Sequence, residues 1–270
     1  MKPKKSQLII MCFVVCLVFI CAGRGFSEPL KEHTLGVSTD ISYIVYDEPD
    51  VMEEKGMMYG AGVSYTYRKD MMFKAEARFS YGQVDYKNSG TIDSIDDYIL
   101  EFRGLVGYDL SEYEGYGITP YIGLGYRYLN DDSSGRVSST GARGYEREAN
   151  YFYSPIGIEI INPLKNDWSM RIALEYDHFW KGIQKSHLSG AVAGFSDLKN
   201  DQNEGYGLRA SLRLQKKTEK IDFLVEPFIR YWDIKQSETT NITYNGVLWG
   251  YGWEPKNTST EIGIRFTAAL

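Results

Sequence analysis

Residues 168–178 have the sequence Trp-Ser-Met-Arg-Ile-Ala-Leu-Glu-Tyr-Asp-His, in which apolar and polar side chains alternate. A period of two places alternate residues on opposite faces of a β-strand. The apolar set comprises Trp168, Met170, Ile172, Leu174 and Tyr176. The other set carries charge at Arg171, Glu175 and Asp177. A soluble sandwich rarely places so many charges in mid-strand. A barrel in a bilayer turns its apolar face to lipid and its polar face to the lumen, so the pattern predicts a transmembrane barrel.

The same alternation recurs from about Leu35 to Phe266, with breaks rich in Gly, Ser, Asn and Asp. We therefore predict an all-β fold, a ten-stranded antiparallel transmembrane β-barrel. A tilted strand needs about 9–11 residues to cross a bilayer, and most of these segments are longer. The expected strands cover residues 34–46, 57–68, 72–86, 96–109, 119–130, 149–161, 168–181, 204–215, 221–235 and 258–268.

The links between these strands alternate in length. We expect long loops at 47–56, 87–95, 131–148, 182–203 and 236–257, and short turns at 69–71, 110–118, 162–167 and 216–220. An even strand number with this alternation is typical of bacterial outer-membrane barrels, which have periplasmic turns and extracellular loops. Both termini would then lie on the periplasmic side.

Residues 1–27 are interpreted as a cleaved signal peptide, followed by one barrel domain at 28–270. Lys2, Lys4 and Lys5 precede an uncharged apolar run at 8–22, and small residues precede cleavage after Ser27. The alternative is a retained membrane anchor, but the apolar run is shorter than the roughly 20 residues that span a bilayer as a helix.

Composition excludes several classes of site and partner. All three cysteines, Cys12, Cys16 and Cys21, lie in the signal, so no disulfide, thiolate metal site or cofactor is expected in the exported chain. The formal net charge of −6 argues against nucleic acid as a partner. The 22 Tyr and 5 Trp are typical of the aromatic girdles at the two membrane interfaces.

The predicted lumen-facing positions carry nearly balanced charge. The cations are Arg68, Lys74, Arg78, Arg103, Arg127, Arg171, Arg209, Arg213, Arg230 and Arg265. The acids are Asp40, Glu76, Glu101, Glu159, Glu175, Asp177, Glu226 and Glu261. Interleaved guanidinium and carboxylate groups can satisfy one another in a confined lumen. Two interpretations remain open: a salt-bridged plug that stiffens a narrow barrel, or a polar conduit that selects or binds a small solute.

Motif spacing predicts no catalytic, cofactor or metal site, because the sequence has no Ser/His/Asp spacing, HExxH motif or cysteine cluster. Asp177 and His178 are adjacent and should face opposite sides of their strand, which argues against an acid–base pair. Acidic residues gather at the expected outer ends of two strands, as Asp93, Asp96 and Asp97 and as Asp131-Asp132. Either group could bind a divalent cation through oxygen ligands, such as Ca²⁺ or a cation that bridges lipopolysaccharide, although solvated acids are the commoner case.

The last strand resembles the closing strand of Gram-negative outer-membrane β-barrel proteins. It reads Glu254-Pro-Lys-Asn-Thr-Ser-Thr-Glu-Ile-Gly-Ile-Arg-Phe266, with Ile262, Ile264 and Phe266 on one parity. The resemblance implies recognition by the barrel assembly machinery of the outer membrane. Ten strands are also similar in architecture to the omptin proteases, whose Asp-x-His arrangement this chain lacks. Lipid-modifying barrel enzymes are a further comparison, and their Ser/His arrangements are not recognisable in this chain.

These observations predict a non-enzymatic integral protein of the cell outer membrane, exposed at the surface or acting as a narrow small-solute channel. Its partners would be the lipid bilayer and lipopolysaccharide, and its oligomeric state is left open. The alternative is an omptin-like or lipid-modifying enzyme at the outer rim, whose candidates would be Asp93, Asp96, Asp97, Asp177, His178 and His187. A soluble periplasmic sandwich is a weaker third reading.

Overall fold

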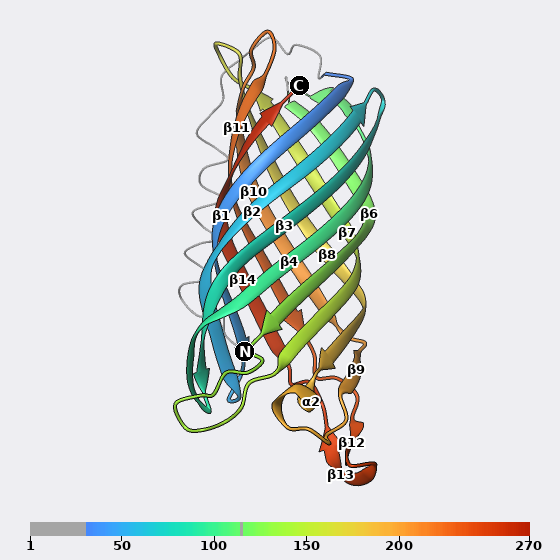
Figure 1. Ribbon diagram of the computed structural model, residues 1–270. Coiled ribbons are helices and arrows are strands. Elements are labelled where there is room, and N and C mark those ends of the chain that lie inside the picture. The colour runs from blue at the N-terminus through green and yellow to red at the C-terminus, as the bar shows by residue number, and fades with distance from the viewer. Residues whose placement is uncertain (1–30, 114–115) are drawn as a thin grey trace.

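The computed structural model describes residues 31–113 and 116–270, so the signal interpreted at 1–27 lies outside the described residues. Ten antiparallel strands form a closed barrel, in which the last strand pairs with the first (Figure 1). The strands are β1 (His33–Glu48), β2 (Met52–Arg68), β3 (Met71–Asn88), β4 (Gly90–Tyr108), β6 (Tyr116–Asp132), β7 (Glu146–Pro163), β8 (Trp168–Ser186), β10 (Gly205–Lys216), β11 (Asp222–Ile234) and β14 (Asn257–Ala269). The prediction of a ten-stranded antiparallel barrel is confirmed.

An apolar band runs around the outside of this barrel. On β3 the outward side chains Met71, Phe73, Phe79 and Tyr81 are all exposed, at 38–48% of their surface. The band on this strand covers residues 71–81, which matches the roughly 9–11 residues that a tilted strand needs to cross a bilayer. Tyr81 lies at one edge of the band, and Tyr108 of β4, which pairs with Met71, lies at the other. The outer wall is therefore built to face lipid, with aromatic residues at both interfaces.

Several strands continue well beyond the outer edge of this band. The segments 47–56 and 87–95, predicted as long loops, are mostly strand: β1 and β2 are joined through 49–51, and β3 and β4 through Ser89. The alternation is inverted in these extensions, because Met52 and Val84 are buried inside whereas Glu53 and Lys55 are not. The loop prediction for these segments is wrong because it expects strands only where the outward-facing residues are apolar. Beyond the membrane the outward-facing residues of a strand are polar.

The remaining long links form a structured cap at the extracellular end. The link after β8 contains α2 (Leu188–Ala191) and β9 (Leu198–Gln202), which pairs with the end of β8. The link after β11 forms a hairpin of β12 (Thr240–Tyr244) and β13 (Val247–Gly252), which projects furthest from the barrel (Figure 1). At the opposite, periplasmic end, β5 (Leu110–Tyr113) pairs with β6. Within residues 31–113 and 116–270, no helix is long and apolar enough to cross a membrane.

Candidate functional site

The charged residues that alternation assigns to the interior all lie on lumen-facing positions and are buried or half-buried. Strand register places many of them directly opposite a residue of the other sign. Arg78 pairs in register with Glu101, and Arg209 pairs with Glu175. The lumen is therefore the candidate functional site.

Arg209 organises the centre of the lumen. Its Nη2 donates to Glu101 Oε1 at 2.5 Å, and its Nε donates to Asp177 Oδ2 at 2.6 Å. Arg209 Nε also lies 3.3 Å from Glu175 Oε1. The Tyr153 hydroxyl donates to Glu101 Oε1 at 2.7 Å. Buried ion pairs are tolerated when additional hydrogen bonds satisfy their remaining atoms, and Tyr153 supplies such a bond.

Arg78 joins two carboxylates on the neighbouring wall. Its Nη2 lies 2.8 Å from Asp40 Oδ1 and 2.5 Å from Glu261 Oε1. Arg230 Nη1 donates to Glu261 Oε2 at 3.0 Å, and Arg265 Nε lies 3.6 Å from Asp40 Oδ2. Three guanidinium groups thus share two buried carboxylates, and the group retains one excess positive charge.

Further ion pairs connect the centre of the lumen to its periplasmic end. Arg103 pairs with Glu175 and, through Nη1, lies 3.3 Å from Glu76 Oε2. Glu76 Oε1 in turn lies 2.8 Å from Lys74 Nζ. Arg213 Nη2 lies 2.5 Å from Glu226 Oε2.

Arg68 holds the periplasmic end itself. Its Nη1 donates to Asp109 Oδ1 at 2.7 Å and its Nη2 donates to Glu159 Oε2 at 2.9 Å. Arg171 Nη1 reaches the same Glu159 oxygen at 3.2 Å. Strands β2, β7 and β8 and the link after β4 therefore contribute to this group of polar contacts at the periplasmic end.

A cavity of about 110 Å³ remains within this polar region. Ten Lys or Arg residues line it, against three acids, Glu76, Glu101 and Asp222. The buried Nε atoms of Arg103, Arg171 and Arg265 have no hydrogen-bond partner. The lining of this cavity therefore carries more cationic than acidic side chains, although the whole set of predicted charges is nearly balanced.

An apolar layer lies in the extracellular half of the lumen, and we define it as Ile44, Met58, Val84, Ile95, Ile99, Leu129, Ala149, Tyr151, Tyr153, Phe179, Trp232 and Ile234. Trp232 is 2% exposed, and its ring centroid lies 5.7 Å from that of Tyr151 and 5.0 Å from that of Tyr153. The guanidinium carbons of Arg127 and Arg209 lie 6.0 and 5.7 Å from the Trp232 centroid. Arginine over an aromatic face joins the apolar layer to the charged region below it.

Sequence reasoning missed this apolar layer. Its members share the lumen parity of the charged residues, as Ile99 does with Glu101 two residues away. The sequence does contain a signal for this layer, namely the position at which apolar residues change from the outward-facing to the inward-facing set. On β1 this change occurs between Tyr43, which faces outward, and Ile44, which faces inward. Such an inversion marks the point at which the strand leaves the lipid band and packs like a soluble barrel.

The structure separates the two residues of the candidate Asp177–His178 pair. Asp177 is fully buried and bonded to Arg209 inside the barrel. His178 lies on the outer wall, where its ring centroid is 4.4 Å from that of Trp180 and 6.5 Å from that of Tyr176. An acid and a base on opposite sides of a wall cannot exchange a proton, so this pair offers no catalytic dyad.

The acidic rim residues are likewise divided. Asp97 is buried in the lumen, in register with buried Asp131. Asp96 faces outward and accepts hydrogen bonds from Tyr81, and Asp93 and Asp132 are exposed. Strand alternation therefore splits both sequence clusters instead of gathering either one around a single cation.

Comparison with protein families identifies the barrel. The family model for the autotransporter beta-domain matches residues 25–220. The chain belongs to the autotransporter beta-domain family. For this autotransporter beta-domain, the predicted outer-membrane barrel family and location in the outer membrane are confirmed. No curated protein matches it significantly.

Solved structures similar to this autotransporter beta-domain are also outer-membrane barrels. The outer membrane protease OmpT from Escherichia coli has 10% identity and a TM-score of 0.55, covering 88% of this chain and 94% of OmpT. The translocator domain of autotransporter NalP from Neisseria meningitidis has 11% identity and a TM-score of 0.45, covering 97% of each chain. The toluene transporter TodX from Pseudomonas putida has 10% identity and a TM-score of 0.35, covering 89% and 90%. At 10% identity, the likeness to OmpT shows the fold alone.

Proposed function

We propose that this outer-membrane barrel is a non-enzymatic surface protein whose lumen is closed, and that its extracellular cap is its working surface. The apolar layer around Trp232 carries the proposal. A constriction lined by packed aliphatic and aromatic side chains excludes water and ions, because it offers them no polar partners. The ion pairs beneath it act as a rigid polar filling, which favours the salt-bridged plug over the open conduit.

The cap supports the same proposal. The hairpin of β12 and β13 exposes Val247, Leu248 and Trp249 at 52–71% of their surface, on the part of the molecule furthest from the membrane. Exposed aromatic and aliphatic residues at a loop tip are typical of contact surfaces. A rim protease or lipid-modifying enzyme has less support, because Asp177 and His178 face opposite sides of the wall.

Planar-bilayer recording tests the closed lumen. We expect the wild-type barrel, shown to be folded by its heat-modifiable gel shift, to give no discrete conductance steps. The triple variant Tyr151→Ala, Phe179→Ala, Trp232→Ala should open the apolar layer and conduct. Its current should be anion-selective, because ten cationic and three acidic side chains line the cavity below.

The opposite result would support an open channel instead of a closed, salt-bridged lumen. Discrete steps from the wild-type barrel, altered by Arg171→Ala, would show that the charged lumen is a conduit. A barrel with Trp253→Ala, which changes an exposed tryptophan in the cap, is the matched control and should behave as the wild type does.

A further inference from the structure

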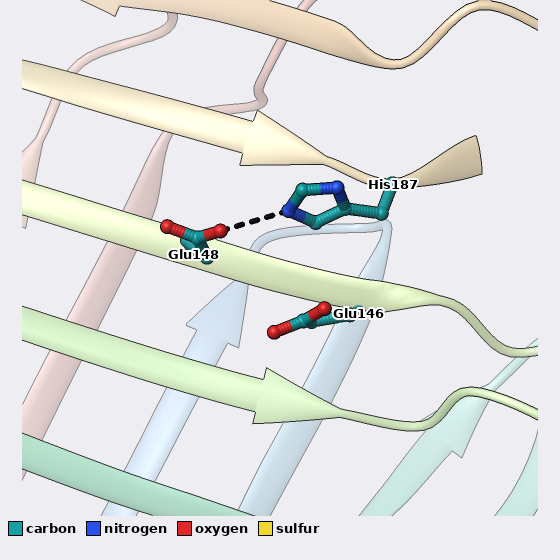
Figure 2. A group of neighbouring side chains, drawn as sticks. All are labelled: Glu146, Glu148 and His187. Carbon is teal, nitrogen blue, oxygen red and sulfur yellow. Dashed lines mark hydrogen bonds and ion pairs between the residues drawn. The ribbon is translucent and has the colours of Figure 1, made fainter. Parts of the chain in front are cut away.

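Two strand ends bring three potential metal ligands together on the outer wall of the extracellular extension. Glu146 and Glu148 are two residues apart at the start of β7 and therefore share one face of that strand. His187 follows the last residue of β8, and its backbone N–H donates to the Glu146 carbonyl at 3.0 Å. Figure 2 shows the three side chains gathered on this face. One ligand atom from each lies within 4.8 Å of the other two.

Each carboxylate of this group is fixed by a neighbour through one of its oxygens. Asn130 Nδ2 donates to Glu146 Oε1 at 2.8 Å. Lys185 Nζ donates to Glu148 Oε2 at 3.0 Å, while Glu148 Oε1 lies 2.8 Å from His187 Nε2. The neighbours thus hold the side chains in place and leave one oxygen of each available to the group. Hydrogen bonds from surrounding residues orient metal ligands in this way.

The imidazole is oriented from its other side by a carboxylate. His187 Nδ1 lies 3.5 Å from Asp197 Oδ2, and Asp197 Oδ1 accepts a hydrogen bond from the Ser189 N–H at 3.0 Å. A carboxylate behind the histidine favours a proton on Nδ1, so a metal that replaces the proton between Nε2 and Glu148 Oε1 would meet the Nε2 lone pair. The same contacts connect the loop that contains α2 to the barrel wall.

We propose that Glu146, Glu148 and His187 bind a divalent transition-metal ion such as Zn²⁺ at the cell surface. One imidazole nitrogen with two carboxylate oxygens favours Zn²⁺ and related ions over Ca²⁺ and Mg²⁺, which prefer oxygen alone. Metal–ligand bonds of about 2.0–2.1 Å in a tetrahedron require ligand atoms about 3.3 Å apart. His187 Nε2 and Glu148 Oε1, which are 2.8 Å apart, would separate by about half an ångström, and the Glu146 oxygen, within 4.8 Å of both, would adjust to the same spacing. A water molecule would complete the coordination.

The group is accessible from outside. The side chains of His187 and Glu148 are 31% and 15% exposed, and both lie on the outer parity, away from the filled lumen. Bound metal would tie the ends of β7 and β8 to the loop at 187–197. The site is independent of whether the lumen conducts.

Zinc binding to the intact, detergent-solubilised barrel, prepared without a polyhistidine tag, tests the proposal by calorimetry. We expect one equivalent of Zn²⁺ to bind the wild type and binding to be lost in His187→Ala. Co²⁺ at the same site should give the visible absorption of a tetrahedral nitrogen–oxygen complex. Asp197→Asn, which keeps all three ligands, should weaken Zn²⁺ binding about 10–100-fold.

His178→Ala is the matched control, because His178 packs against Trp180 on the lipid-facing wall, and it should bind Zn²⁺ as the wild type does. No binding by folded wild-type protein, or equal binding by His187→Ala, would overturn the proposal and leave the group as a histidine–carboxylate ion pair. The heat-modifiable gel shift establishes folding for every variant.

Discussion

Trp232→Ala tests whether the apolar layer is packed as a hydrophobic core. Trp232 is 2% exposed, and its ring contacts Tyr151 and Tyr153 inside the barrel. Removing a buried tryptophan side chain costs about 3–5 kcal/mol, because the transfer free energy is lost and a cavity remains. The guanidinium groups of Arg127 and Arg209 also lose a ring face, and each such contact is worth about 0.5–2 kcal/mol. We expect a total loss of at least about 4 kcal/mol in the free energy of unfolding, which is the sum of the lower ends of these ranges.

The assay is urea unfolding of the barrel in lipid vesicles, followed by circular dichroism and by the folded band on gels. The midpoint should fall while the dependence on urea concentration stays constant, which indicates lost stability without a change in the surface exposed. Trp253→Ala is the control, because Trp253 is 51% exposed, and it should change stability by no more than about 0.5 kcal/mol. A loss below about 1 kcal/mol for Trp232→Ala, or equal losses in the two variants, would refute a packed layer.

Two further predictions concern space in the lumen and charge in the cap. A Cβ at Gly125 would overlap the Tyr153 ring, so Gly125→Ala should lower the free energy of unfolding in urea by about 1–3 kcal/mol. Gly104→Ala, with no atom near its Cβ, should not lower it, and equal effects of the two substitutions would contradict this fit. In the cap, burial and the neighbouring Glu48 raise the pKa of Glu254 to about 8. The folded state thus holds this proton more tightly than the unfolded state, so stability should fall as pH rises from the ordinary glutamate range to about 8. Glu254→Gln should flatten this fall when the melting temperature is measured against pH. An unchanged pH profile in the variant would show that Glu254 does not cause the fall.

The proposed function gives the parts of the barrel different physical roles. In this proposal the lipid-facing band anchors the protein, ion pairs such as Arg78 with Glu261 stiffen its wall, and the apolar layer closes the lumen. Polar fillings of this kind are costly to break, because removing one partner leaves an unpaired charge in a confined space. The loops of the cap can therefore change in sequence while the barrel that supports them keeps its structure.

The sequence by itself determined the class of the fold, the number of barrel strands and the face that meets lipid. These features depend on a period of two within one strand, as in residues 168–178, and a local period needs no knowledge of partners. The same alternation assigned charges such as Arg209 and Glu101 to the interior. It also separated Asp177 from His178 before any contact was known.

Only the tertiary structure decided which side chains meet. Register and closure bring Glu101 to Arg209, which is 108 residues away, and bring His187 to Glu148 across the β7–β8 pair. The prediction of loops at 47–56 and 87–95 is wrong for a related reason. Whether the outward-facing residues of a strand are apolar or polar depends on whether lipid or water surrounds that part of the strand. Pairing across strands and the level of the membrane are properties of the closed barrel, and no single segment of the chain contains them.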